Sequence, residues 1–463
     1  MKASQVLTQD TIAAIATPLG EGGVAVIRVS GGEAPRILQK LFRPGRKEWE
    51  SHHLYVGTMN VSEEGRMLDQ GMAVWMKAPH SYTGEEVVEF HVHGGALSTH
   101  RILETILSMG ARLAEAGEFS KRSFLNGKID LIQAEAVCDL VSAKTELFLQ
   151  EAQRRLQGGL SQHINALRQS LIQLLAHVEA TLDFPEEEGV GEIHRDQAQN
   201  QLKPIQEKLK KLVASYEEGR RIREGIRVAI VGRPNVGKSS IFNRLMNFDR
   251  AIVTEIPGTT RDTIEEVVSF SGIQFHLADT AGIRSTSNRI EKEGIQRAWG
   301  QLRLSDLALI ILDGSENLTD EDRSLLKEAP MHRSIVAINK IDLPEKLTAQ
   351  TLKPVLNGTP VIPISALKGE GMERLRGALV QEAFEERKEG AQGVMITLSR
   401  HKVALERGVK SLEEADRALE QGLPLEIVAG ELRGALDAIG EVVGVTTNEE
   451  VLNEIFRRFC IGK

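Results

Sequence analysis

Residues 232–240, which read Gly-Arg-Pro-Asn-Val-Gly-Lys-Ser-Ser, constrain the fold of this chain more than any other segment. They match the phosphate-binding pattern G-x-x-x-x-G-K-[ST]. The apolar run at 228–231 predicts a buried strand before the loop, and 240–245 predicts a helix after it. Gly232 and Gly237 let the backbone curl so that its N–H groups point at phosphate oxygens. This context predicts a nucleotide-binding domain rather than a glycine-rich turn before an ordinary helix.

The side chains of the loop have expected tasks. Lys238 is expected to reach the β- and γ-phosphates, and the Ser239 hydroxyl to hold Mg²⁺. The residues of the loop expected to contact the nucleotide are Asn235, Val236, Gly237, Lys238, Ser239 and Ser240.

Two later segments predict the γ-phosphate side of the site. Residues 276–282 read as a strand that ends at Asp279 and turns at Gly282. Asp279 can support Mg²⁺ through water, and the Gly282 amide can sense the γ-phosphate. A hydroxyl of the pair Thr259 and Thr260 can complete the Mg²⁺ shell. Thr280 and Ala281 are expected to contact the nucleotide as well.

A third segment selects the base. Asn339-Lys340-Ile341-Asp342 follows a predicted strand at 334–338, and Ser365 and Ala366 follow another predicted strand. A carboxylate accepts hydrogen bonds from N1–H and the exocyclic amine of guanine, whereas adenine lacks that donor pair. Asp342 therefore predicts a guanine reader, with Ser365 and Ala366 on the other side of the base. Each segment alone is also compatible with a polar turn, but the four in this order favour a GTP site.

Composition bounds the class of protein. The length of 463 residues suggests about three domains, and 41% hydrophobic residues are enough for folded cores. No apolar run approaches a membrane span, and the N-terminus lacks the apolar region of a signal peptide. The two cysteines, Cys138 and Cys460, do not make a disulfide framework, so we expect a cytoplasmic protein. A net charge of −8 implies that any RNA contact uses a local patch or a partner.

The pattern along the chain predicts a multidomain α/β protein. Strand and turn signals alternate through 1–125, which predicts an α+β domain. Helical periodicity fills 126–224 and returns at 387–463, while 225–386 alternates strands and helices. We therefore expect a discontinuous helical domain with a Ras-like P-loop GTPase domain inserted into it.

The end of the chain predicts a packed helix. Residues 447–450 have the spacing of a capping box, and an apolar stripe follows at Val451, Leu452, Ile455, Phe456 and Phe459. We expect this end to dock onto another part of the protein.

The catalytic apparatus departs from a common GTPase pattern. Many GTPases place a water-orienting glutamine directly after the Asp-x-x-Gly turn, but this chain has Ile283 there. We also find no evident arginine finger in the sequence. A carboxylate further along the loop can orient the water, and a monovalent cation can neutralise the developing charge.

Three further segments carry a resemblance to a known family. They are 117–128 (Gly-Glu-Phe-Ser-Lys-Arg-Ser-Phe-Leu-Asn-Gly-Lys), 130–136 (Asp-Leu-Ile-Gln-Ala-Glu-Ala) and 459–463 (Phe-Cys-Ile-Gly-Lys). Together with the nucleotide motifs, they make the whole chain resemble the MnmE family of tRNA-uridine modification GTPases, also called TrmE.

The resemblance implies a K⁺-stimulated GTPase that forms a homodimer through its GTPase domains. It implies that Glu291 orients the attacking water, although on sequence alone Glu291 is also compatible with an exposed glutamate at a helix start. The implied Mg²⁺ ligands are Ser239 and Thr260. The implied K⁺ ligands are Asn235, Thr254, Ile256 and Thr259, of which Thr254 is also expected to contact GTP.

The resemblance also implies a folate site in the N-terminal domain, which is expected to contribute to dimerisation too. It would bind a tetrahydrofolate derivative of the 5-formyl or 5,10-methylene type through Arg28, Glu89, Lys128 and Lys463. Cys460 matches the family's functional cysteine, although a small packed hydrophobe explains it nearly as well. The implied partners are tRNA and an MnmG-type flavoprotein carrying FAD, with which the chain would modify C5 of the wobble uridine.

Three alternatives stay open. Glu89, His91 and His93 alternate along a predicted strand and so project from one face, as a metal triad would. The chain could be a ribosome-assembly switch GTPase, although its sequence shows no pattern of an additional RNA-binding domain. It could also be a folate-dependent enzyme whose GTPase domain is only regulatory.

Overall fold

The computed structural model describes residues 10–45, 48–60, 66–183, 194–248, 265–279, 305–328, 333–352, 356, 358–384 and 393–463. Its chain divides into two compact units. The first unit contains 1–141, 153–209 and 404–463, and the second contains 142–152 and 210–403. In the described parts, no helix is both long enough and apolar enough to cross a membrane.

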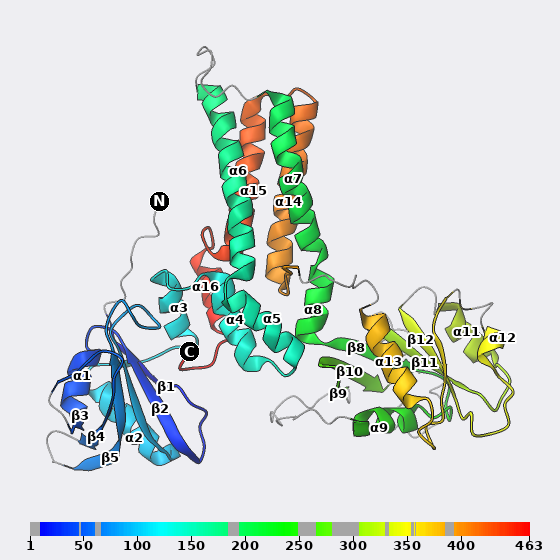
Figure 1. Cartoon of the computed structure of the whole chain (residues 1–463), viewed down its shortest axis with the longest axis horizontal. Coiled ribbons are helices and arrows are strands. Elements are labelled where there is room, and N and C mark those ends of the chain that lie inside the picture. The colour runs from blue at the N-terminus through cyan, green and yellow to red at the C-terminus, as the bar shows by residue number, and fades with distance from the viewer. Residues whose placement is uncertain are drawn as a thin grey trace. The chain divides into compact units, whose positions relative to one another are not determined.

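The first unit begins with a seven-stranded sheet in the order β3-β4-β5-β6-β2-β1-β7 (Figure 1). All neighbours are antiparallel except β1 and β7. The strands are β1 (Ile12–Ile15), β2 (Gly22–Ser30), β3 (Phe42–Pro44), β4 (Leu54–Asn60), β5 (Met67–Met76), β6 (Val87–Gly94) and β7 (Arg112–Leu113). These strands, together with the helices between them, match the α+β domain predicted for 1–125.

Helices cover one face of this sheet. Alternate residues of β2 and β6, such as Ile27 and Phe90, point into a core with α1 (Ala34–Leu41) and α2 (Ala96–Ser108). Their neighbours Arg28 and Glu89 therefore face the opposite side, because successive side chains of a strand alternate. At one end that opposite side meets α3 (Glu118–Leu125), whose Phe119 packs with Ile12 and Ala14 of β1.

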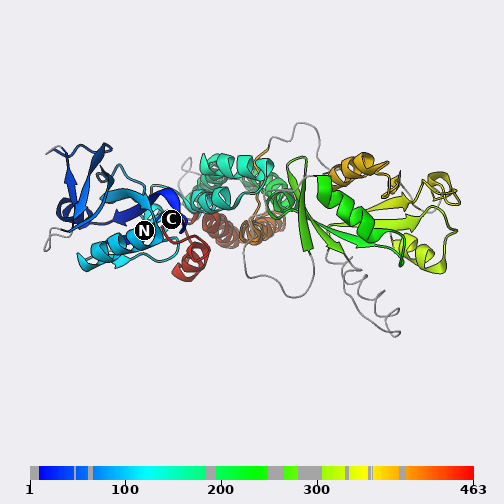
Figure 2. The same ribbon diagram turned by 90° about the horizontal axis from the view of Figure 1, so that it is seen from below.

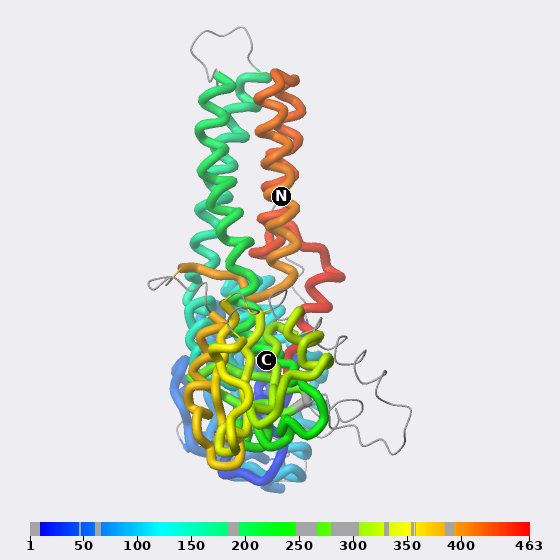
Figure 3. Tube along the Cα trace, turned by 90° about the vertical axis from the view of Figure 1, so that its right-hand side faces the viewer, coloured from blue at the N-terminus to red at the C-terminus, as the bar shows by residue number. Residues whose placement is uncertain are grey.

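Four long helices form a bundle in which α6 packs on α15. They lie side by side in Figures 1 and 3, the first two drawn in green and the last two in orange to red. The helices are α6 (Gly159–Asp183), α7 (Arg195–Ala214), α14 (Ser399–Glu420) and α15 (Leu425–Val443). Because two of them precede the nucleotide domain in sequence and two follow it, the helical domain is discontinuous, as predicted.

Shorter helices complete the helical part. They are α4 (Leu131–Ser142), α5 (Glu146–Leu156), α8 (Tyr216–Glu224) and α16 (Glu449–Phe456). The predicted cap of the last helix is present, since the Asn448 side chain accepts a hydrogen bond from the Val451 amide. Leu452, Phe456 and Phe459 are buried against α4, whereas Val451 of the predicted stripe is exposed.

The end of the chain docks onto the N-terminal sheet domain, as predicted. Ile461 pairs with Ala116, and the Gly117 amide donates to the Cys460 carbonyl at 3.4 Å. Figures 1 and 2 show this end, marked C, beside the blue strands. Gly462 has φ +95° and packs on the Ile15 carbonyl, so a side chain there would be strained and crowded.

The second unit contains a six-stranded sheet in the order β13-β12-β11-β8-β10-β9, parallel except for β9. The strands are β8 (Ile226–Val231), β9 (Glu265–Phe270), β10 (Ile273–Asp279), β11 (Leu307–Asp313), β12 (Ser334–Asn339) and β13 (Val361–Pro363). The helices are α9 (Lys238–Phe248), α11 (Asp320–Glu328), α12 (Ala349–Leu352) and α13 (Met372–Ala383).

Both faces of this sheet are covered. On β8, Val228 and Ile230 pack with α9 and α13, while Ala229 and Val231 pack with α11 and α12. Strands buried on both sides explain the continuous apolar runs in the sequence. This is the predicted Ras-like P-loop fold. The exact limits of the three predicted domains stay a prediction.

Candidate functional site

The predicted phosphate loop joins β8 to α9. Gly237 has φ +99°, and a side chain at that position would overlap the Asn339 amide nitrogen. Asn235 also has a left-handed backbone, with φ +63°. The chain therefore curls tightly before α9 begins at Lys238, which leaves the positive end of the helix dipole at the loop.

Lys238 is buried beneath this loop. Its ammonium group donates to the Gly232 carbonyl at 2.7 Å and to the Arg233 carbonyl at 2.8 Å. Ser239 and Ser240, the next residues in the first turn of α9, are exposed. The loop thus supplies a fixed positive charge, helix amides and two accessible hydroxyls, which suits a phosphate group with a bound cation.

A cavity of about 470 Å³ lies beside the loop. It is lined by residues of the loop and of both predicted base-reading segments: Gly237, Ser240, Asn243, Arg244, Asn339, Lys340, Asp342, Leu343, Ala366 and Leu367. The structure therefore brings the predicted residues Gly237, Ser240, Asp342 and Ala366 to one cavity, although they come from distant parts of the sequence.

The carboxylate predicted to read the base is held in place. Ser365 Oγ donates to Asp342 Oδ1 at 2.7 Å. This hydrogen bond, together with the charges of Lys368 and Lys340, lowers the pKa of Asp342. Asp342 is therefore ionised at neutral pH and presents acceptors only, which suits the two N–H groups of guanine.

The Asn339 side chain connects the phosphate loop to the segment that contains Ala366. Its side-chain amide donates to the Val236 carbonyl of the phosphate loop at 2.8 Å. Its oxygen accepts from the Ala366 amide at 3.0 Å. The sequence motif marked Asn339 but not this bridging role, which depends on the strand order β8-β11-β12-β13. Two further contacts were not predicted: Lys340 pairs with Asp313 at 2.5 Å, and Arg244 donates to the Ala366 carbonyl at 2.9 Å.

The other half of the predicted nucleotide site is not described. Asp279 ends β10 and lies in register with Ile230 of β8, next to the strand that leads into the phosphate loop. The predicted residues Thr254, Ile256, Thr259, Thr260, Thr280, Ala281, Gly282, Ile283 and Glu291 lie outside the described residues. Their roles stay predictions.

A second group of predicted residues meets on the N-terminal sheet. Arg28 Nε donates to Glu89 Oε1 at 2.8 Å, and Arg28 Nη1 donates to the Gly462 carbonyl at 3.4 Å. The guanidinium lies 5.6 Å from the ring centres of both Tyr82 and Phe119. Sequence reasoning predicted Arg28 and Glu89 but missed both rings, although Phe119 lies within the motif at 117–128.

The two predicted lysines differ in their surroundings. Lys463 is half-buried, and burial together with the like charge of Arg28 lowers its pKa. Lys128 is exposed and donates to the Pro79 carbonyl at 3.0 Å. It lies against Gly84, in the same loop that carries Tyr82. The side chain of Cys460 is exposed, and its role stays a prediction.

The alternative of a metal triad has little support in the described residues. His93 pairs with Asp69 of β5 at 2.8 Å and is exposed, whereas His91 lies 3.6 Å from Glu89. No group of three or more potential metal ligands occurs in the part of the chain that the structure describes.

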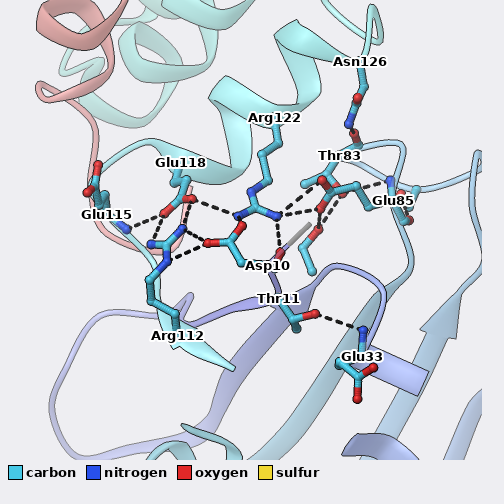
Figure 4. Close-up of polar contacts among 12 residues, drawn as sticks. Asp10, Thr11, Glu33, Thr83, Glu85, Arg112, Glu115, Glu118, Arg122 and Asn126 are labelled. Atoms are coloured by element: carbon cyan, nitrogen blue, oxygen red, sulfur yellow. Dashed lines mark hydrogen bonds and ion pairs between the residues drawn. The ribbon is translucent and has the colours of Figure 1, made fainter. Parts of the chain in front are cut away.

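A buried ion network supports the loop and the helix that flank Arg28 (Figure 4). The side chain of Arg122, in α3, is only 3% exposed. It bonds to Asp10 Oδ1 at 2.8 Å, to Glu118 at 3.0 Å and to Glu85 at 3.2 Å. Arg112 binds Asp10 and Glu118 from the other side, at 2.7 and 2.6 Å. Arg122 thus joins α3, the loop with Tyr82 and the start of β1.

Comparisons with known proteins cover nearly the whole chain. A family model described as the GTP-binding protein TrmE N-terminus matches residues 11–128, and one described as the MnmE helical domain matches 131–460. The chain is 44% identical over 457 residues to the tRNA modification GTPase MnmE of Geobacter sulfurreducens. It is 42% identical over 464 residues to that of Heliobacterium modesticaldum. Both alignments cover 98% of this chain and 99% of the relative.

Solved structures give a more partial match. The G domain of the T. maritima FeoB iron transporter is 30% identical and covers 34% of this chain and 98% of its own. The TM-score is 0.27.

The hydrogen bond between Ser365 and Asp342 predicts that a substitution of Asp342 changes which nucleotide base is bound. Asp342→Asn places an amide N–H group where the wild type has a carboxylate oxygen. This N–H group cannot accept a hydrogen bond from the N–H groups of guanine. Xanthine has a carbonyl in place of the exocyclic amine, and the new amide can donate to it. Loss of a charge-assisted pair costs ~1.5–3 kcal/mol, so we expect GTP affinity to fall roughly tenfold to a hundredfold, with a gain for XTP. Titration with fluorescent GTP and XTP analogues measures both. Equal weakening of both nucleotides would contradict the role of Asp342.

The ion network predicts a large stability cost for one substitution. Arg122→Met removes the buried guanidinium of this network, so Glu85 loses its ion pair while Asp10 and Glu118 keep only Arg112, and we expect a cost of about 3–5 kcal/mol. Two of the three tryptophans, Trp49 and Trp75, lie in the N-terminal domain, so urea unfolding followed by fluorescence reports on it. Arg36→Met, which breaks an exposed pair with Glu33, is the matched control and should cost less than about 1 kcal/mol.

The same network predicts how stability changes with pH. Burial alone would raise the pKa values of Asp10 and Glu118, but Arg112 and Arg122 hold both below their ordinary values of 3.8 and 4.5. Both carboxylates therefore stabilise the fold above those values and lose this effect as the pH falls further. We expect a smaller loss in Arg122→Met, and identical acid profiles would contradict this account.

Proposed function

This chain belongs to the MnmE family of tRNA modification GTPases and hydrolyses GTP, and we propose that it uses GTP to modify C5 of the wobble uridine of tRNA. In this proposal an MnmG-type flavoprotein supplies FAD, and the product carries an aminomethyl or carboxymethylaminomethyl group. The main support is that one chain combines two polar sites. The first is the predicted guanine site at Asp342, and the second is the group around Arg28, which the Gly462 carbonyl contacts. A switch GTPase of ribosome assembly would have no evident use for that second site.

The N-terminal site is proposed to bind a tetrahydrofolate derivative of the 5-formyl or 5,10-methylene type, which supplies the one-carbon unit. Arg28 and Lys463 bring positive charge close together, and burial together with the charge of Arg28 lowers the pKa of Lys463. Such a pair suits the carboxylates of a folate tail, and exposed Lys128 can extend it. Glu89, held by Arg28, offers an acceptor for the N–H groups of the pterin ring.

GTP hydrolysis is proposed to depend on K⁺. Asn235 lies exposed at the tip of the phosphate loop in a left-handed conformation, so its side-chain oxygen can reach a cation at the nucleotide. Thr254, Ile256 and Thr259 would supply the other K⁺ ligands, and Ser239 and Thr260 the Mg²⁺ ligands. Glu291 would orient the water in place of the glutamine that this chain lacks.

A homodimer is part of the proposal. The open face of the N-terminal sheet carries Leu54 and Val56, which are in register with Val74 and Met72 and are both exposed. Val56 is 63% exposed, which is unusual for a strand residue flanked by other apolar side chains. A second copy of this chain would cover these side chains. The nucleotide domains are proposed to associate as well, through the K⁺-dependent loops.

The central test is nucleoside mass spectrometry of tRNA from a strain that lacks this protein. We expect unmodified wobble uridine in that strain and restoration by the wild-type chain. Arg28→Gln should fail to restore the modification while GTP hydrolysis persists. Normal wobble uridine in the deletion strain would overturn the proposal. If immature ribosomal particles accompanied it, the alternative of a ribosome-assembly GTPase would be favoured.

The cation role predicts a specific loss in Asn235→Ala. Removal of one electrostatic stabiliser of the transition state typically costs about 10²–10³ in turnover. We therefore expect wild-type hydrolysis to be fast in K⁺ and slow in Na⁺ at equal ionic strength, and the variant to be slow in both. Nucleotide affinity, measured in parallel, should change little. A variant that kept its K⁺ stimulation would contradict the assignment.

A further inference from the structure

His91 lies next to Glu89 on the open face of the N-terminal sheet. In the antiparallel register, Glu89 is opposite Arg28 and His91 is opposite Val26. On the other side, β5 places Val74 opposite Glu89 and Met72 opposite His91. Directly opposed residues share a face, so Arg28, Glu89 and His91 form a polar row between apolar neighbours.

The Glu89 carboxylate is only partly satisfied by the protein. Its Oε1 accepts from Arg28 at 2.8 Å, while its Oε2 lies 3.6 Å from His91 Nε2, beyond hydrogen-bond distance. Burial alone would raise the pKa of Glu89, but His91 and Arg28 together hold it below its ordinary value. Glu89 is therefore ionised at neutral pH and accepts hydrogen bonds only.

His91 Nε2 is a buried polar atom that makes no hydrogen bond to the described residues. A buried polar atom without a partner costs about 1–3 kcal/mol, and such atoms are uncommon in folded proteins. The histidine two residues further along, His93, contrasts with it because Asp69 binds its ring.

The surroundings suit a flat ligand. Val26, Met72 and Val74 are half-buried and flank the polar row, so they offer apolar contact to a planar ring. Glu89 Oε2 and His91 Nε2, 3.6 Å apart, place an acceptor beside a potential donor. A ring edge that carries N–H groups next to a carbonyl oxygen complements this pair.

We propose that His91 determines ligand specificity in the N-terminal site, where its Nε2–H donates to the ring carbonyl while Glu89 accepts from the adjacent N–H groups. This inference rests on the proposed function, under which the ring is the 2-amino-4-oxo pterin of a reduced folate. The 4-oxo group is then the partner that His91 lacks. A 4-amino group at the same position presents a donor to a donor and is disfavoured.

The test compares two matched ligands on the full-length chain by calorimetry. The ligands are tetrahydrofolate and its 4-amino-4-deoxy counterpart. We expect the wild-type chain to favour the 4-oxo ligand by about tenfold or more, since one unsatisfied buried group is worth about this factor. His91→Leu should bind both ligands nearly equally. His91→Gln, which restores an N–H donor, should recover most of the preference.

Two controls separate the possible failures. His100→Leu changes an exposed histidine of α2 and should keep the wild-type preference. If Arg28→Gln binds tetrahydrofolate as tightly as the wild type, the folate site itself is wrong, and this inference falls with it. If Arg28→Gln loses binding but His91→Leu keeps the full 4-oxo preference, the folate site stands and the role of His91 is overturned.

Discussion

The N-terminal site depends on one buried guanidinium. Arg122 is surrounded by carboxylates from α3, from the loop before β6 and from the start of β1. An arginine taken out of water is costly unless its partners are fixed around it, so these three segments can meet in few other ways. Two of them carry the aromatic rings that flank Arg28. The arrangement of side chains around Arg28 therefore depends on the neutralisation of a second arginine, Arg122.

In the nucleotide domain, too, one side chain holds separate segments together, but this side chain, Asn339, is neutral. Asn339 offers one donor and one acceptor, and each is used by a different loop. Both loops follow the carboxyl ends of parallel strands, where ligand sites of open α/β sheets form. A neutral amide fixes these loops without adding charge beside Asp342, whose carboxylate is predicted to bind the base.

The sequence predicts a feature well when the residues that form it lie close together along the chain. The phosphate loop and the fold class follow from local chemistry, so motif and periodicity were enough for them, while the reading of guanine by Asp342 stays a prediction. The alternation of β6 correctly predicted that Glu89, His91 and His93 share a face. It could not predict that a neighbouring strand brings Asp69 to His93, while His91 Nε2 makes no hydrogen bond to any described residue. The rings around Arg28 depend on long-range packing, for which no local pattern exists.

The contact between Arg28 and Gly462 joins residues 434 positions apart. Arg28 leaves the ribosome early, and the nucleotide domain is synthesised in full before Gly462 exists. The contact between Arg28 and Gly462 can therefore form only after the nucleotide domain has been synthesised. A chain interrupted shortly before that glycine would keep its whole nucleotide domain and lack this hydrogen bond to Arg28.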